Sequence, residues 1–291
     1  MTSTALAAEG IAPRGRRGET VLRALRRPTA ALAAIFVFLI VFGAIAAPWI
    51  APYPVSQFDY LHLFSPSSFA HPFGTDELGR DLFTRVLYGG RTSLGIAALA
   101  TLIAMVVGSI WGFAAAFRRG WVDDVLMRAA DLTLGMPVIL LGLVLVAAFG
   151  SSIFSLVLIL GILFAPATAR LARSAILAEL ESDYYLAAIS VGARPWRIVF
   201  EQLLPNTLPV LLARGSIVAA DAIFVEATLS FVGLGVQPPA ASWGTLLHTG
   251  YSNLYRAYGY SIFPGIVIVV TVLALNTLGD SLQRALDPSR R

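Results

Sequence analysis

Six long apolar stretches alternate with shorter polar segments along the 291-residue chain. A helix rises about 1.5 Å per residue, so roughly 20 apolar residues cross a hydrocarbon core of about 30 Å, and each stretch is of this order. Pro137 interrupts the third stretch and is expected to bend it. We therefore predict an all-α, polytopic membrane protein with one domain over 29–288 and six transmembrane helices, at about 29–50, 93–117, 127–149, 153–171, 207–229 and 262–278.

The arginines indicate the orientation of these helices. Six arginines precede the first stretch, and none follows until Arg80. Cytoplasmic segments are enriched in basic residues, so both termini and the loop 172–206 are placed inside, with 51–92 and 230–261 outside. Residues 1–28 are expected to form a cytoplasmic tail and an amphipathic helix on anionic membrane lipid. A signal peptide fits less well, because the following apolar stretch is too long.

Composition narrows the function classes. Hydrophobic residues make up 57% of the chain and charged residues 13%, against about 25% charged in soluble domains. All 21 basic residues are arginine, so the lysine of a nucleotide-binding P-loop is missing and no ATPase site is expected. There is no cysteine, and the three histidines lack metal-ligand spacing. We predict no catalytic residue, no metal site and no nucleic-acid partner, because the arginine distribution explains the net charge of +4.

A polar insert at 181–206 carries signals for a short helix, a turn and a second short helix. Asp183 suits a helix N-terminus, where backbone N–H groups are unpaired. The small Ala187 and Ala188 allow a partner backbone to approach, and Gly192 ends the first helix. We expect a docking surface, completed by the donors Arg194 and Arg197 and closed by Pro205 and Asn206. The alternative is an ordinary amphipathic loop helix.

A second polar stretch, 71–97, lies in the external segment. Asp76 and Glu77 suit a helix start, and the expected structure is a capped amphipathic helix that braces the outer mouth. Its arginines can pair locally with Asp81. The later loop, 224–247, is expected to be re-entrant or on the surface, with Trp243 in the aromatic belt. Candidate residues for an external gate or docking site are Phe73, Gly74, Asp76, Arg80, Asp81 and Arg85.

The fifth apolar stretch contains three ionisable residues, Arg214, Asp221 and Glu226. Such groups are costly at membrane depth and face a bundle interior, a pore or a partner. Arg214 lies near the inner end and Glu226 near the outer end, where water or an ion partner is expected. A structural or gating role is favoured over a proton relay.

Four motifs resemble the permease subunits of ABC importers. The polar insert matches their cytoplasmic signature at Ala187-Ala188, Gly192 and Leu204-Pro205, with Leu186 in place of its Glu and Gln202 in place of its Ile. The peptide and nickel class is matched more specifically, and the chain is most similar to its second, C-type, permease. The strings that carry this resemblance are Phe73-Gly74-Thr75-Asp76, Gly79-Arg80-Asp81, Glu226-Ala227, Leu229-Ser230-Phe231, Gly233-Leu234-Gly235, Pro238-Pro239, Trp243-Gly244 and Phe263-Pro264-Gly265.

The resemblance implies a type I importer permease with a cytoplasmic coupling helix in a bacterial plasma membrane. It implies a second homologous permease, two cytoplasmic ATPase subunits that hold ATP and Mg, and an external substrate-binding protein, while this chain binds no cofactor. Di- or oligopeptides are the expected cargo, although nickel, glutathione or haem-like molecules can use the same scaffold. The ATPase-coupling set would be Asp183, Ala187, Ala188, Gly192, Arg194, Arg197, Leu204 and Pro205.

Two other function classes are weaker. A self-contained proton- or ion-coupled carrier would use Asp131, Asp221 and Glu226. Such carriers normally contain internal repeats, and no convincing repeat is present; nor would a carrier need the insert at 181–206. A membrane-embedded enzyme would need a cluster of reactive groups, which the sequence does not offer.

Overall fold

The computed structural model describes residues 27–286, and the regular structure in that range is helical apart from one isolated β-bridge between Thr75 and Asp81. Five helices are long and apolar enough to cross a membrane, and the bent pair α5 and α6 makes a sixth candidate. The prediction of an all-α membrane protein is confirmed for this range. The helices are α2 Pro28–Ile45, α3 Ala47–Ile50, α4 Leu82–Arg118, α5 Gly120–Leu134, α6 Val138–Phe149, α7 Ile153–Leu180, α8 Asp183–Ser190, α9 Pro195–Ile198, the π-helix η1 Val199–Leu203, α10 Leu204–Phe231, α11 Trp243–Ser252 and α12 Gly259–Leu286.

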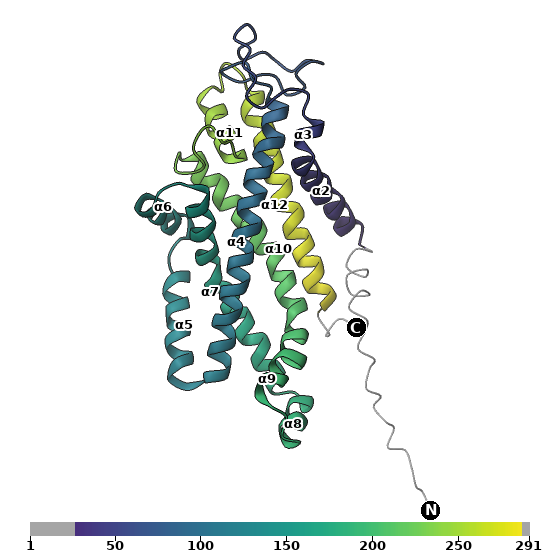
Figure 1. The fold of residues 1–291 in the computed structure, drawn as a ribbon, viewed down its shortest axis with the longest axis vertical. Coiled ribbons are helices and arrows are strands. Elements are labelled where there is room, and N and C mark those ends of the chain that lie inside the picture. The colour runs from purple at the N-terminus through teal and green to yellow at the C-terminus, as the bar shows by residue number, and fades with distance from the viewer. Residues whose placement is uncertain (1–26, 287–291) are drawn as a thin grey trace, which may run out of the picture.

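The helices form an elongated bundle with different structures at its two ends (Figure 1). Helices α8 and α9 form the tip of one end, which we call the coupling end. Segment 51–81 and α11 lie at the opposite end, which we call the outer end. The tail and amphipathic helix expected over 1–28 fall almost entirely outside the described residues, as does the chain from Asp287 onward.

The centre of the bundle is the close pairing of α4 with α7. Glycines on both helices allow this approach, as is common between membrane helices. A Cβ at Gly112 of α4 would lie 2.4 Å from the carbonyl oxygen of Ala169, and one at Gly161 of α7 would lie 2.6 Å from Cγ2 of Ile103. The pair therefore has no room for larger side chains at these positions.

Helix α4 begins at Leu82, whereas the second span was expected to begin at 93. The helix start expected at Asp76 and Glu77 is also wrong. The reason is local capping: the Asp81 carboxylate accepts the backbone N–H of Thr84 at 2.7 Å, which satisfies a donor of the first helical turn. Helix ends follow such capping and turn residues rather than the limits of the apolar stretch. Helices α7, α10 and α12 likewise exceed the expected 153–171, 207–229 and 262–278.

The third expected span, 127–149, consists of two helices bent by 92°. The bend predicted at Pro137 is confirmed, since the break falls between Leu134 and Val138. The polar stretch before it, expected as a turn, is the first half of α5. Two contacts hold α5 to the bundle: Arg173 donates to Asp123, with Nε at 2.6 Å from Oδ1, and Trp111 Nε1 donates to the Leu126 carbonyl at 3.2 Å.

Pro205 and Asn206 were expected to end the polar insert before the next membrane helix, and this expectation is wrong. Helices α9, η1 and α10 follow one another without a gap from Pro195 to Phe231. Pro205 is tolerated because it comes directly after the π-helical turn, where the hydrogen-bond ladder changes register. The second half of the insert is therefore the start of a membrane-spanning helix.

Candidate functional site

The first half of the polar insert is an exposed helical hairpin at the coupling end. Helix α8 begins at Asp183, and the chain turns at Gly192 into α9 (Figure 1). Most of the predicted coupling residues are exposed there: Asp183, Ala187, Gly192, Arg194 and Arg197. Ala188 differs, because it is buried against Ile198 and Leu203 of the same chain. Leu204 and Pro205 are partly buried in the helix that follows.

The backbone conformation at position 192 favours glycine, whereas packing places no limit on the side chain there. The φ of Gly192 is +72°, a region that side chains with a Cβ rarely adopt. The N–H of Gly192 donates to the carbonyl of Ile189 at 2.9 Å, and the N–H of Ala193 donates to the carbonyl of Ala188 at 3.0 Å, which ends α8. A Cβ at Gly192 would meet nothing within 4 Å, so the space beside the turn is open.

The two predicted donors of the hairpin have different surroundings. Arg197 Nε donates to Glu201 Oε2 at 2.8 Å, and both side chains are more than half exposed. Arg194 has no side-chain partner within the described residues. Its guanidinium is therefore not engaged by a carboxylate of this part of the chain.

A polar cluster that the sequence did not predict holds the hairpin to the bundle. The hydroxyl of Tyr184 on α8 donates to the Glu179 carboxylate at the end of α7. Asn206 Nδ2, on α10, donates to that carboxylate at 3.3 Å and to the Tyr184 hydroxyl at 3.1 Å. Burial, and then the neighbouring Glu179, raise the pKa of Tyr184, so the phenol stays protonated and able to donate. The cluster ties α7, α8 and α10 together.

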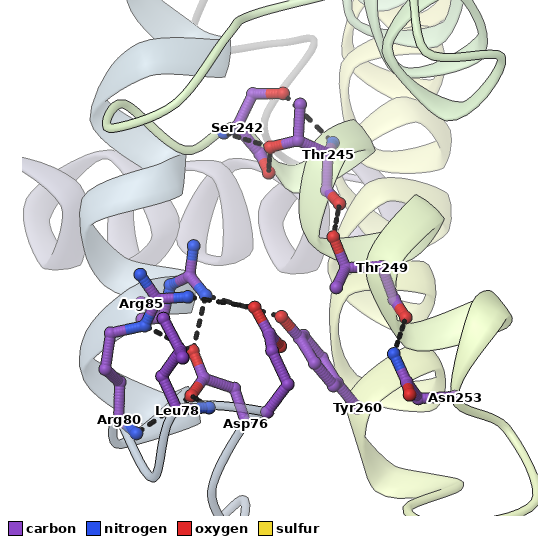
Figure 2. A network of polar contacts seen from close by, with 10 residues as sticks. Asp76, Leu78, Arg80, Arg85, Ser242, Thr245, Thr249, Asn253 and Tyr260 are labelled. Carbon is purple, nitrogen blue, oxygen red and sulfur yellow. Dashed lines mark hydrogen bonds and ion pairs between the residues drawn. The ribbon is translucent and has the colours of Figure 1, made fainter. Parts of the chain in front are cut away.

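At the outer end, Asp76 is the centre of a second polar cluster. Its carboxylate is fully buried and accepts from Arg80 Nε at 2.6 Å, from Arg85 Nη1 at 2.5 Å and from the backbone N–H groups of Leu78 and Arg80 (Figure 2). Arg85 also donates to the Tyr260 hydroxyl of α12 at 3.3 Å. A buried carboxylate with this many donors fixes the shape of the segment around it.

The other predicted residues of this segment attach it to the helices. Phe73 stacks on Phe263 of α12, with ring centroids 4.0 Å apart. The expected pairing of the arginines with Asp81 is wrong, because Asp81 accepts from His71 Nδ1 at 3.0 Å and caps α4. The turns at Gly74 and Gly79 have positive φ, as tight turns require. We call residues 51–81, held in this way, the outer cap.

Glu226 is fully buried and forms no ion pair with residues 27–286, whereas an ion partner or water was expected at this end of the helix. Ser93 Oγ of α4 donates to Oε2 at 3.0 Å, and Ser230 Oγ donates to Oε1 at 2.7 Å. The backbone N–H of Trp243 donates in turn to Ser93 Oγ at 3.1 Å. Hydrogen bonds to the carboxylate offset the cost of burying it, so Glu226 joins α4, α10 and α11.

Trp243 does not lie in the aromatic belt predicted for it. Its side chain is 2% exposed, and Nε1 donates to the Val86 carbonyl of α4 at 2.9 Å. Helix α11 starts one residue after Ser242, whose capping box with Thr245 explains the fold of the loop. Figure 2 shows that further hydrogen bonds follow along α11: the Thr249 hydroxyl donates to the Thr245 carbonyl, and Asn253 Nδ2 donates to the Thr249 carbonyl.

The three acids of the carrier hypothesis do not form a relay. Asp131 forms an ion pair with Arg170, Glu226 is held by serines, and Asp221 lies on another part of α10. Residues 27–286 contain no group of three His, Cys, Asp or Glu side chains placed to hold a metal ion.

Comparisons with known proteins agree with this architecture. Residues 17–67 match the N-terminal transmembrane domain of oligopeptide transport permease C. A glutathione transport system permease of Pectobacterium atrosepticum is 39% identical, with 91% of this chain and 89% of the relative covered. A di/tripeptide transport system permease of Pseudomonas aeruginosa is 38% identical over 87% and 86%, and a dipeptide transport system permease of Bacillus subtilis is 36% identical over 92% and 85%.

The fold is also found among solved structures. An inward-facing structure of the MetNI methionine ABC transporter has a chain with a TM-score of 0.58 and 21% identity, covering 70% of this chain and 96% of that one. Residues 104–291 match the family model described as the inner membrane component of binding-protein-dependent transport systems. With this match and relatives of up to 39% identity over nine-tenths of its length, the chain belongs to that family of ABC transporter permeases.

Proposed function

We propose that this permease forms half of the pathway by which an ATP-driven importer moves di- and oligopeptides into a bacterial cell. The names of its relatives support this cargo, because they specify dipeptides, di/tripeptides and glutathione, which is itself a small peptide. A second homologous permease would supply the other half, two cytoplasmic ATPases would bind ATP and Mg, and an external binding protein would deliver the peptide.

We place the coupling end in the cytoplasm. The turn between α4 and α5 and the hairpin of α8 and α9 lie at that end (Figure 1), and they carry Arg118, Arg119, Arg194 and Arg197. Cytoplasmic segments are enriched in such basic residues. The outer cap would then face the binding protein, and both termini would lie inside. The protein would be a multi-pass component of the bacterial plasma membrane.

The observation that carries this proposal is the unbroken helix from α9 through η1 to α10. A displacement of the exposed hairpin by an ATPase would pass directly into a membrane-spanning helix. The cluster of Glu179, Tyr184 and Asn206 would pass the same displacement to α7. A π-helical turn such as η1 is often found at functional sites. Here it lies between α9, in the exposed hairpin, and α10, the membrane-spanning helix.

Closure of the ATPases on ATP would thus switch the spans from an inward-open to an outward-open state. Peptide released by the binding protein would enter the pathway between the two permeases, and ATP hydrolysis would return the transporter to the inward-open state. This chain would supply coupling contacts and half of the pathway, whereas the ATPases would bind and hydrolyse ATP.

The test is reconstitution of all the subunits in proteoliposomes. We expect uptake of a radiolabelled dipeptide that requires ATP and is lost when the binding protein is omitted. Liposomes with an ATPase subunit inactivated in its P-loop are the matched control. Dipeptide uptake by this chain alone, driven by a proton gradient without ATP, would overturn the proposal and favour a secondary carrier.

A further inference from the structure

Helix α10 carries polar residues at partly exposed positions of its membrane-spanning part, in addition to the exposed apolar residues Leu208, Leu212 and Phe224. On α12 the exposed residues between positions 262 and 273 are apolar and 45–60% exposed, which suits contact with lipid: Ile262, Ile266, Val269 and Leu273. On α10, Arg214, Asp221 and Thr228 are partly exposed and follow one another at intervals of seven residues. Seven residues are nearly two turns of about 3.6, so these three side chains share one face of the helix.

This polar face is bordered by contacts between α10 and the bundle, because Ile217, three residues after Arg214 and four before Asp221, lies on the same side of the helix. Ile217 meets α12, where a Cβ at Gly279 would lie 2.7 Å from its Cγ1. Glu226 meets Ser93 of α4. The face with Arg214 and Asp221 is left partly open by these contacts.

The two charges on this face are unsatisfied within the described part of the chain. Arg214 Nε is buried without a hydrogen-bond partner, and Asp221 makes no hydrogen bond or ion pair with residues 27–286. Their charges attract one another along the helix, but they do not meet. Glu226, by contrast, has its hydrogen bonds supplied by serines. Unpaired charges at membrane depth do not face lipid, so something polar must lie against Arg214 and Asp221.

We propose that Asp221 and Arg214 form a binding site for zwitterionic peptides inside the translocation pathway. Asp221 receives the ammonium group and Arg214 the carboxylate. Seven residues separate the two positions by about 10 Å along the helix axis, and an extended di- or tripeptide spans about 7 to 11 Å. Asp221 is nearer the outer end, so the peptide binds with its N-terminus toward the outer cap. The site rests on the proposed function and adds to it the groups that contact the cargo.

The first test is accessibility to water. The chain contains no cysteine, so a single introduced cysteine can be followed on this subunit without background. We expect charged, membrane-impermeant thiosulfonates, applied to both sides of the membrane, to modify Asp221→Cys and Arg214→Cys in the full complex. Leu273→Cys on α12 is the control and should react only with a membrane-permeant maleimide. Resistance of both α10 cysteines to the charged reagents would overturn the proposal and place this face against the second permease.

The second test asks whether charge recognition matters. Asp221→Cys should lower dipeptide uptake about tenfold, as expected for the loss of one charged hydrogen bond, while delivery by the binding protein is unchanged. A sulfonatoethyl reagent restores the negative charge and should recover much of the uptake, whereas a trimethylammonioethyl reagent should not. Equal effects of the two reagents would overturn the site. The variants are compared with wild-type complexes that transport dipeptide. If the wild-type complex itself takes up no peptide, the proposed function fails and the binding site is not the cause.

Discussion

The Ser93 hydroxyl on α4 donates a hydrogen bond of 3.0 Å to the carboxylate of Glu226 on α10, although 133 residues separate them in the sequence. The same Ser93 oxygen accepts the backbone N–H of Trp243 at the start of α11. One small side chain thus connects three helices at the outer end. An acidic residue that could suggest proton transport is instead part of the internal framework.

Ser93→Ala should destabilise the complex. Glu226 and the Trp243 N–H each lose a buried partner, at a cost of about 1 to 3 kcal/mol. The measurement is thermal unfolding of the purified complex in detergent. Ser174→Ala is the control, since Ser174 is exposed and donates only to Leu171 of its own helix at 2.9 Å. Equal melting temperatures for the two variants would contradict the framework role of Ser93.

Gly192→Val should uncouple ATP hydrolysis from peptide uptake. The added side chain occupies the open space at the tip of the hairpin and strains a backbone with φ of +72° by about 1 to 2 kcal/mol. Gly120→Val is a matched control, because Gly120 has φ of +61°, is also surrounded by open space and lies in the turn between α4 and α5. The number of peptides taken up per ATP should fall for Gly192→Val alone. A similar fall in both variants would indicate strain and not docking.

Tyr184→Phe should weaken the coupling without altering the hairpin surface. It removes the hydroxyl that joins Glu179 and Asn206, with a loss of about 1 kcal/mol. Uptake per ATP is again the measurement. Tyr185→Phe, at the next position and packed against the small apolar cluster around Ile198, is the control. Full coupling in the Tyr184 variant would show that the helix α9 to α10 alone transmits the motion.

Asp76→Asn should disorganise the outer cap. Two arginines lose a fully buried carboxylate partner, and breaking such a buried pair costs about 3 to 5 kcal/mol. We expect a lower melting temperature and loss of the ATPase stimulation caused by the binding protein. Asp59→Asn, which removes an exposed pair with His62, should have a much smaller effect. If binding-protein-dependent transport survives the Asp76 substitution, the outer cap neither seals nor docks.

Much of the fold and part of the candidate site could be predicted from the sequence, because the signals are local. The lengths of apolar stretches indicate membrane helices, and Pro137 marks the bend between α5 and α6. Asp183, Gly192 and Pro195 mark the hairpin of α8 and α9, since helix starts and ends depend on a few neighbouring residues.

Only the tertiary structure decided which partners the polar residues take. Asp76 was predicted to start a helix and instead holds Arg80 and Arg85, while Trp243 was assigned to the membrane surface and is buried against α4. Asp221 and Glu226 were both predicted as polar residues within the membrane. Asp221 has no hydrogen-bond or ion-pair partner among residues 27–286, whereas Glu226 accepts hydrogen bonds from Ser93 and Ser230. Hydrophobicity and capping act over a few turns of one helix, but a hydrogen-bond partner is brought into reach only when distant segments pack.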